Sequence, residues 1–187
     1  MTYYHGTKVT GLFELVPINS PDTTLHKPTI YFTDSPVFAI FYIWNKPFKW
    51  MTYTFSDNGT PIYTEWFLNQ LEYFYKSVSG VIYSTESSTI MPTHMQKVFI
   101  SDTAVKVDEY RYIPDVYETI LEFEKANQII IKRYETLTEA ELQQIEKQII
   151  SAIHKEKLLS RDIPKTDFVK MMFPVAWEKS KEENGEY

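Results

Sequence analysis

The order of local signals along the chain restricts its fold more than any other feature of the sequence. Through the first two thirds, short β-branched and aromatic segments alternate with clusters of Gly, Pro, Asn and Asp. The last third changes character, because Thr138 followed three residues later by Glu141 forms a capping box that opens a long amphipathic pattern. Strands early and helices late predict an α+β domain rather than a parallel doubly wound sheet.

The same signals give the expected elements. The expected strands cover residues 2–7, 29–33, 48–56, 81–85, 98–100, 104–112 and 128–134. The expected helices cover residues 37–44, 65–77, 114–126 and 138–159, with a turn-rich loop at 17–28, a turn at 57–59 and a charged tail from Lys179 that we expect to fray. We expect an α+β core over residues 1–135 and a helical extension over 136–187 packed on the same domain.

Length and composition limit the function classes. A chain of 187 residues suits one domain with a sizeable core. It contains no cysteine, which removes disulfides, thiolate metal sites and a cysteine nucleophile. The formal charge of -6 disfavours general nucleic-acid binding but leaves room for a small polyanion in a local pocket. The N-terminus lacks a signal-peptide pattern, and no apolar run approaches the roughly 20 residues of a membrane span, so we expect a cytoplasmic protein.

The most informative local pattern is Tyr-His-Gly-Thr at residues 4–7 in the first expected strand. Ile-Tyr-Phe-Thr-Asp follows at residues 30–34. Asp-Ser-Pro at residues 34–36 then supplies a cap residue and a proline at the first helical position, and the apolar helix that they open contains Tyr42. In order and spacing this pattern resembles the NAD-binding core of the ADP-ribosyltransferase superfamily, in the diphtheria-toxin-like branch that includes poly(ADP-ribose) polymerases and RNA 2'-phosphotransferases. The resemblance covers mainly residues 3–45. A looser similarity at residues 79–83 is to a Gly-Tyr strand of small bacterial and phage proteins of that superfamily.

This resemblance implies an ADP-ribosyltransferase-like split sheet and an NAD site. His5 would hydrogen-bond a ribose hydroxyl, Gly6 would let the backbone approach the carboxamide, and Tyr31 would stack on the nicotinamide ring. Tyr42 would close the other face of that ring. The implied supporting polar side chains are those of Thr7, Thr33 and Ser35.

The family's third signature residue, a glutamate at the start of a late strand, has no match in this sequence. Its carboxylate stabilises an oxocarbenium-like transition state, a contribution usually worth a few kcal/mol. The segment that we align with that strand, residues 96–101, begins with Gln96 and Lys97 instead. We take Glu86 as the candidate third catalytic residue, with Glu109 as the alternative carboxylate. Polymer formation is therefore not expected.

The leading hypothesis is an NAD-dependent mono-ADP-ribosyltransferase-like enzyme that uses NAD as substrate and has a protein among its candidate acceptors. A nucleotide-binding module without catalysis, a phosphotransferase and a protein-interaction domain docking through its C-terminal helical stripe remain alternatives. The phosphotransferase would need arginines converging on a phosphate, and none lies near residues 4–7 in sequence. The four histidines are dispersed, so we expect no metal site.

Overall fold

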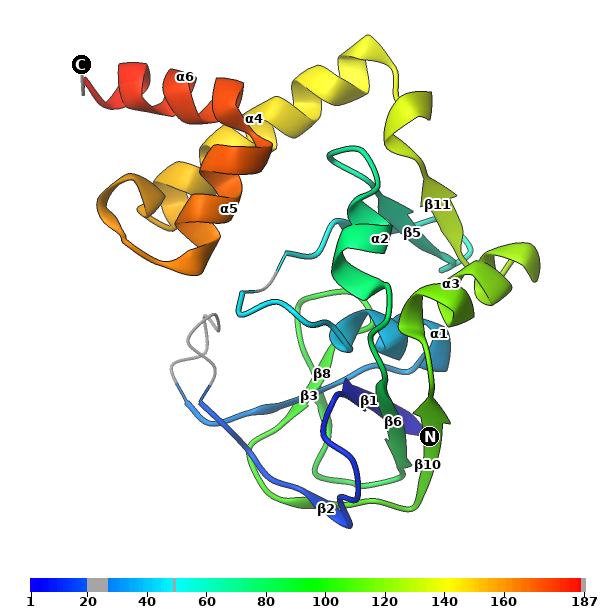
Figure 1. The fold of residues 1–187 in the computed structure, drawn as a ribbon. Coiled ribbons are helices and arrows are strands. Elements are labelled where there is room, and N and C mark those ends of the chain that lie inside the picture. The colour runs from blue at the N-terminus through cyan, green and yellow to red at the C-terminus, as the bar shows by residue number, and fades with distance from the viewer. Residues whose placement is uncertain (20–26, 49, 186–187) are drawn as a thin grey trace. The chain divides into compact units, whose positions relative to one another are not determined.

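A computed structural model describes residues 1–19, 27–48 and 50–185 of the chain. It shows a mixed fold of helices and several small sheets (Figure 1), which agrees with the expected mixture of strands and helices. The chain divides into two compact units. The first comprises residues 1–46, 53–63 and 71–131, and the second comprises residues 47–52, 64–70 and 132–187.

The first unit is organised around one antiparallel sheet. Its strands, in spatial order, are β1 (Tyr3–Thr7), β6 (Gly80–Thr85) and β10 (Glu109–Ile113). In the register of this sheet, His5 lies opposite Tyr83, and Tyr83 lies opposite Tyr110. Since side chains directly opposite one another share a sheet face, one face carries all three rings in a row.

A second small sheet adjoins β1 at a single point. Its strands are β3 (Ile30–Phe32), β8 (Phe99–Ser101) and β7 (Met91–Pro92), and a separate ribbon pairs β2 (Glu14–Leu15) with β9 (Val105–Lys106). One isolated bridge, Tyr4 to Thr33, links β1 with β3. Apolar side chains of these strands form one buried cluster together with others from β6 and from just before β7: Leu15, Ile30, Phe32, Val81, Tyr83, Ile90 and Val105.

A third sheet contains the expected turn at residues 57–59. Its strands are β4 (Tyr53–Phe55), β5 (Pro61–Thr64) and β11 (Ile130–Lys132). Gly59 has φ 81°, and β4 pairs with β5 as a hairpin, which confirms the turn. The helical segments that complete this part of the chain are α1 (Pro36–Ala39), the 3₁₀ turn η1 (Ile40–Tyr42), α2 (Gln70–Tyr75) and α3 (Val116–Lys125).

The second unit is mainly helical. Its helices are η2 (Tyr134–Thr136), α4 (Glu139–Lys155), η3 (Leu158–Ser160), α5 (Pro164–Met172) and α6 (Pro174–Asn184). The predicted capping box is confirmed, since Glu141 N–H donates to Thr138 Oγ1 (3.3 Å) and Thr138 N–H donates to Glu141 Oε2 (2.9 Å). The bond from Thr138 and the pairing with Lys132 lower the pKa of the Glu141 carboxyl to about 2. The described helices include none with the length and apolarity that crossing a membrane requires.

Several expected elements are shorter than the sequence pattern predicted. The 3₁₀ turn η1 replaces the last part of the helix expected at 37–44, and the helix expected at 65–77 begins only at Gln70. The strand expected at 104–112 is broken, because Val107 N–H pairs with Phe13 O and Asp108 N–H pairs with Ser84 O as the chain changes partners. Residues 20–26 of the expected loop, and residue 49 of the expected strand at 48–56, lie outside the described residues.

The fraying expected from Lys179 is wrong for residues 179–184. These residues continue α6, which ends at Asn184 with Gly185 in the left-handed conformation (φ 74°) as its C-cap. Buried Ala176 and Trp177 hold the first turn of the same helix in the core of the second unit. Charge alone therefore does not prevent a helix that is anchored at one end and capped by glycine at the other.

Candidate functional site

Pairing between β1 and β3 stops at the Tyr4–Thr33 bridge, and we call the place just past this bridge, where the buried residue Gly6 lies, the gap. The two strands meet through Tyr4 and Thr33, whose N–H and C=O groups bond each other at 2.8 and 2.9 Å. Alternate residues of a strand direct their backbone groups to the same side, so the Gly6 N–H and C=O point the same way as those of Tyr4. Among the described residues, neither group makes a hydrogen bond outside the β1–β6 ladder. Gly6 thus presents a donor and an acceptor side by side.

His5 stands next to this gap with a defined tautomer. Its Nδ1 lies 2.8 Å from the carbonyl oxygen of Tyr31. A carbonyl can only accept, so Nδ1 carries the proton, and Nε2 of the neutral ring is an acceptor. Burial lowers the pKa of His5, while the hydrogen bond to Tyr31 opposes that shift in part. At neutral pH the ring therefore offers one acceptor nitrogen, which suits a hydroxyl donor.

Three tyrosines gather around the same region from separate segments. Tyr31 lies on β3, Tyr42 ends η1, and Tyr53 begins β4. Burial is the largest cause that raises the pKa of Tyr42, followed by the nearby hydroxyl and hydrogen bond of Tyr53 and then by the hydroxyl of Tyr31. Burial also raises the pKa of Tyr53. Tyr42 and Tyr53 therefore remain uncharged, and with Tyr31 they bring three aromatic rings and their hydroxyl groups to this region.

Sequence analysis found Tyr31 and Tyr42 but missed Tyr53. The only signal at Tyr53 was its place in an expected strand at residues 48–56, and nothing in that pattern indicates which residue β4 brings to Tyr42. A partner that approaches through a separate hairpin leaves no local signature.

The expected supporting hydroxyls hold local structure. Thr7 Oγ1 accepts a hydrogen bond from Val9 N–H at 3.2 Å, and Thr33 Oγ1 accepts one from Ser35 N–H at 3.3 Å. Ser35 Oγ accepts from Phe38 N–H at 3.3 Å and thereby caps α1, as the Asp-Ser-Pro signal predicted. All three side chains lie on segments that border the gap, and each shapes the backbone there.

The candidate carboxylates lie elsewhere on the sheet. Glu86 accepts a hydrogen bond from Thr2 Oγ1 at 2.9 Å. Because His5 faces Tyr83 in the register, Glu86 lies three residues further along, about 10 Å at the rise of a strand. Glu109 is opposite Ser84 on β10, on the side of β6 away from β1. Neither register position brings a carboxylate to the His5 ring.

The start of the strand that we aligned with the family's glutamate carries an ion pair. Lys97 Nζ lies 3.2 Å from Asp34 Oδ1, and both side chains are about one quarter exposed. Lys97 also adopts a left-handed conformation with φ 58°. A cation therefore stands near the position where the resemblance would require an anion.

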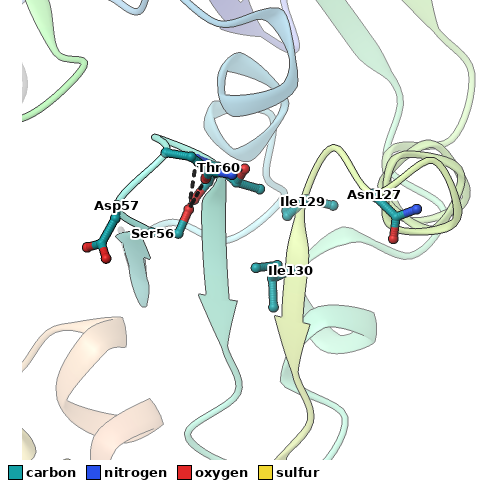
Figure 2. A pocket seen from close by; sticks show the side chains of 7 residues that line it. Ser56, Asp57, Thr60, Asn127, Ile129 and Ile130 are labelled. Atoms are coloured by element: carbon teal, nitrogen blue, oxygen red, sulfur yellow. Dashed lines mark hydrogen bonds between the residues drawn. The ribbon is translucent and has the colours of Figure 1, made fainter.

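A shallow hollow of about 500 Å³ lies beside the β4–β5 hairpin (Figure 2). Its polar groups bond one another, since Ser56 N–H donates to Thr60 O at 3.0 Å and Thr60 N–H donates to Ser56 Oγ at 3.0 Å. Asn58 Oδ1 accepts from the Thr60 hydroxyl at 2.9 Å. These bonds stabilise the turn and leave few polar groups to recognise a ligand.

Comparisons with protein-family models, curated proteins and solved structures give no match to this chain. Across the described residues, no group of three or more His, Asp and Glu side chains is arranged to hold a metal ion. The motif at residues 4–7 and 30–34 and the local geometry of the first unit are therefore the features that bear on function.

We expect His5 to titrate below the ordinary histidine pKa of 6.5. The folded state favours the neutral ring, so the unfolded state takes up a proton first as the pH falls. The contribution of the neutral His5 ring to the free energy of unfolding is therefore complete above pH 6.5, and it is lost as the pH falls from 6.5 towards the lowered pKa. Histidine-selective NMR titration gives the pKa, and urea unfolding between pH 5 and 7 should show a smaller acid loss for His5→Gln. A His5 pKa at or above 6.5 would contradict the expected effect of burial.

Proposed function

We propose that this protein binds NAD in the gap between β1 and β3, with the nicotinamide carboxamide on the backbone of Gly6. The observation that carries the proposal is the pair of backbone groups of Gly6, its N–H and its C=O. Both lie on the edge of β1 that faces β3, just past the Tyr4–Thr33 bridge. A primary carboxamide has one acceptor oxygen and an NH₂ donor on the same carbon. It can pair with both groups of one residue at once.

The neighbouring side chains suit the rest of the nicotinamide riboside. Tyr31 and Tyr42 supply aromatic rings for stacking on the pyridinium, a planar cation that tyrosine faces attract. Nε2 of His5 supplies the acceptor for a ribose hydroxyl. These residues match those that the ADP-ribosyltransferase resemblance implies, and the proposal includes a core of that type.

We further propose that binding occurs without efficient ADP-ribosyl transfer. Cleavage of the nicotinamide bond develops positive charge on the ribose, and a carboxylate beside it lowers the barrier by a few kcal/mol. Glu86 is held by Thr2, and the start of β8 carries the Lys97–Asp34 pair. An NAD-binding module is therefore favoured over a transferase.

Calorimetric titration should separate NAD from its deamido analogue, in which a carboxylate replaces the carboxamide. The analogue lacks the NH₂ group that would donate to Gly6 C=O, and it places a negative charge against that oxygen. We therefore expect its affinity to be lower than that of NAD by a factor of about ten or more. Tyr31→Ala should weaken NAD binding by a similar factor. Tyr117→Ala, a tyrosine on α3, is the matched control and should leave the affinity unchanged.

Nicotinamide release is measured by chromatography in the same samples. Binding with at most trace release supports the proposal. Rapid release that is lost in Glu86→Gln would instead show that the protein cleaves NAD with Glu86 as a catalytic residue. Equal affinity for NAD and its deamido analogue, or no binding of NAD by the wild type, would refute the Gly6 site.

A further inference from the structure

A separate cavity of about 530 Å³ opens on the first unit between a loop and the strands β6 and β10. Its floor is formed by Tyr83 on β6 and by Tyr110 and Tyr112 on β10, and its roof includes Leu12 and Phe13. Asp108, just before β10, lines the same cavity. The lining is thus mainly aromatic and aliphatic with one carboxylate, a composition different from that of the gap at Gly6.

The alternation of β10 explains why these side chains share a wall. Asp108, Tyr110 and Tyr112 are spaced by two residues, so they project to the same face of the sheet. The register places Tyr110 opposite Tyr83. Sequence analysis recognised a strand here but did not use the two-residue spacing of an acid and two tyrosines, which was the signal for this cavity.

Hydrogen bonds hold the roof in place. The Tyr83 hydroxyl donates to Val9 O at 3.1 Å and accepts from Leu12 N–H at 3.0 Å. On the other side, Val107 N–H donates to Phe13 O at 3.0 Å. Gly11, with φ 74°, allows the loop to turn between these attachments. The cavity is therefore formed before any ligand arrives.

The aromatic rings at the mouth are exposed to an unusual degree. The exposed fractions are 89% for Phe13, 72% for Tyr110 and 55% for Tyr112. Large rings are normally buried, so three of them around one cavity mark a binding surface. Asp108 accepts from Glu86 N–H at 2.9 Å and, within the described part of the chain, forms no ion pair. Its charge remains available to a ligand.

We propose that this cavity binds the guanidinium group of an arginine. Cations are attracted to the faces of tyrosine and phenylalanine rings, and a planar guanidinium both stacks on such rings and pairs with a carboxylate. No lysine or arginine lines the cavity, and the chain carries a net charge of -6, so a positively charged ligand is favoured over a phosphate. This inference is independent of the NAD proposal.

The test uses two blocked amino acids that differ in charge but hardly in shape, Nα-acetyl-arginine amide and Nα-acetyl-citrulline amide. Each is titrated into the full-length protein and followed by ¹H–¹⁵N NMR. We expect saturable shifts confined to the roof loop and β10 with the arginine compound, and an affinity about tenfold lower with citrulline. Equal affinities would overturn the proposal, because the cavity would then respond to shape and apolarity alone.

Four variants sharpen the comparison. Asp108→Asn keeps the acceptor for Glu86 N–H but removes the charge, and Tyr110→Ala removes a ring, so each should weaken arginine binding by about tenfold. Tyr112→Phe keeps its ring and should bind as the wild type does. Glu122→Gln on α3 is the control for a lost negative charge. A loss with Glu122→Gln equal to that with Asp108→Asn would refute a local site.

A further arm identifies the source of the arginine. The tripeptide Gly-Arg-Gly, if it binds more tightly than the blocked amino acid, indicates a protein partner. Equal affinity indicates a free small molecule, and both outcomes support guanidinium recognition. Displacement of the arginine compound by adenosine at similar concentration would overturn it in favour of an aromatic ligand.

Discussion

Gly6→Ala is expected to destabilise the first unit by about 3 kcal/mol, near the upper end of the usual cost of adding a methyl group to a well-packed core. The added Cβ would lie 2.0 Å from the carbonyl oxygen of Ala39 and 3.2 Å from Ile43 Cγ1. The first of these atoms belongs to the backbone of α1, so no side-chain rotation can relieve the clash. Either β1 or α1 must shift, and NAD binding at the displaced Gly6 should be lost with it. Urea unfolding of both proteins gives the change in the free energy of unfolding.

Gly11→Ala is the matched control for this prediction. The conformation of Gly11, with φ 74°, costs an alanine roughly 1–2 kcal/mol, but its Cβ would meet nothing within 4 Å. A larger loss for Gly6→Ala than for Gly11→Ala shows that close packing against α1 requires the glycine. Equal losses would contradict that explanation and leave only the general cost of replacing a glycine.

The same glycine shows what the sequence could and could not predict about the candidate site. The resemblance assigned Gly6 to close approach of a ligand. The structure also gives it a packing role, because the face of β1 on which its Cβ would lie packs directly against α1. Tyr31 and Tyr42 were placed correctly on a strand and on the helical segment after it. Glu86 was taken as the candidate carboxylate, with Glu109 as the alternative, but neither carries a local signal that reveals its strand partner, so the sequence could not show that both register positions lie away from the His5 ring.

Elements with strong end signals were predicted best. Ser35 before Pro36 predicted the start of α1, and Thr138 with Glu141 predicted the start of α4. The strand β5 was missed, and α5 and α6 were expected only as part of a helical extension over residues 136–187, without bounds of their own. In α5 and α6 the N-cap residues are Ile163 and Phe173, which make no side-chain cap hydrogen bond. These helices depend on tertiary packing, such as that of Phe173 on Trp50 at 5.4 Å between ring centroids, which no local pattern reports.

Tyr75→Ala should destabilise the first unit by about 3–5 kcal/mol, the cost of truncating a large buried ring. Tyr75 is 1% exposed and packs edge-on against Phe41 and Tyr63, with centroid separations of 5.7 and 6.1 Å. Its hydroxyl donates to Phe41 O at 3.2 Å. Tyr75→Phe keeps the ring but leaves that buried carbonyl without this donor, so a smaller loss of about 1–3 kcal/mol is expected. Urea unfolding at pH 7 measures both.

The pH dependence of unfolding of the wild type and Tyr75→Phe tests whether the buried Tyr75 hydroxyl is the cause of this difference in stability. Burial raises the pKa of the Tyr75 hydroxyl well above its ordinary value of 10, so the unfolded state releases the proton first as the pH rises. The contribution of this hydroxyl is therefore complete below pH 10 and is lost above it. Tyr75→Phe should lose less stability than the wild type between pH 9 and 11. Parallel alkaline losses in the two proteins would show that other groups govern that transition.

Since Phe41 directly precedes Tyr42 in η1, a weaker NAD affinity in Tyr75→Phe with the fold intact would indicate that the buried hydroxyl helps to position the Tyr42 ring.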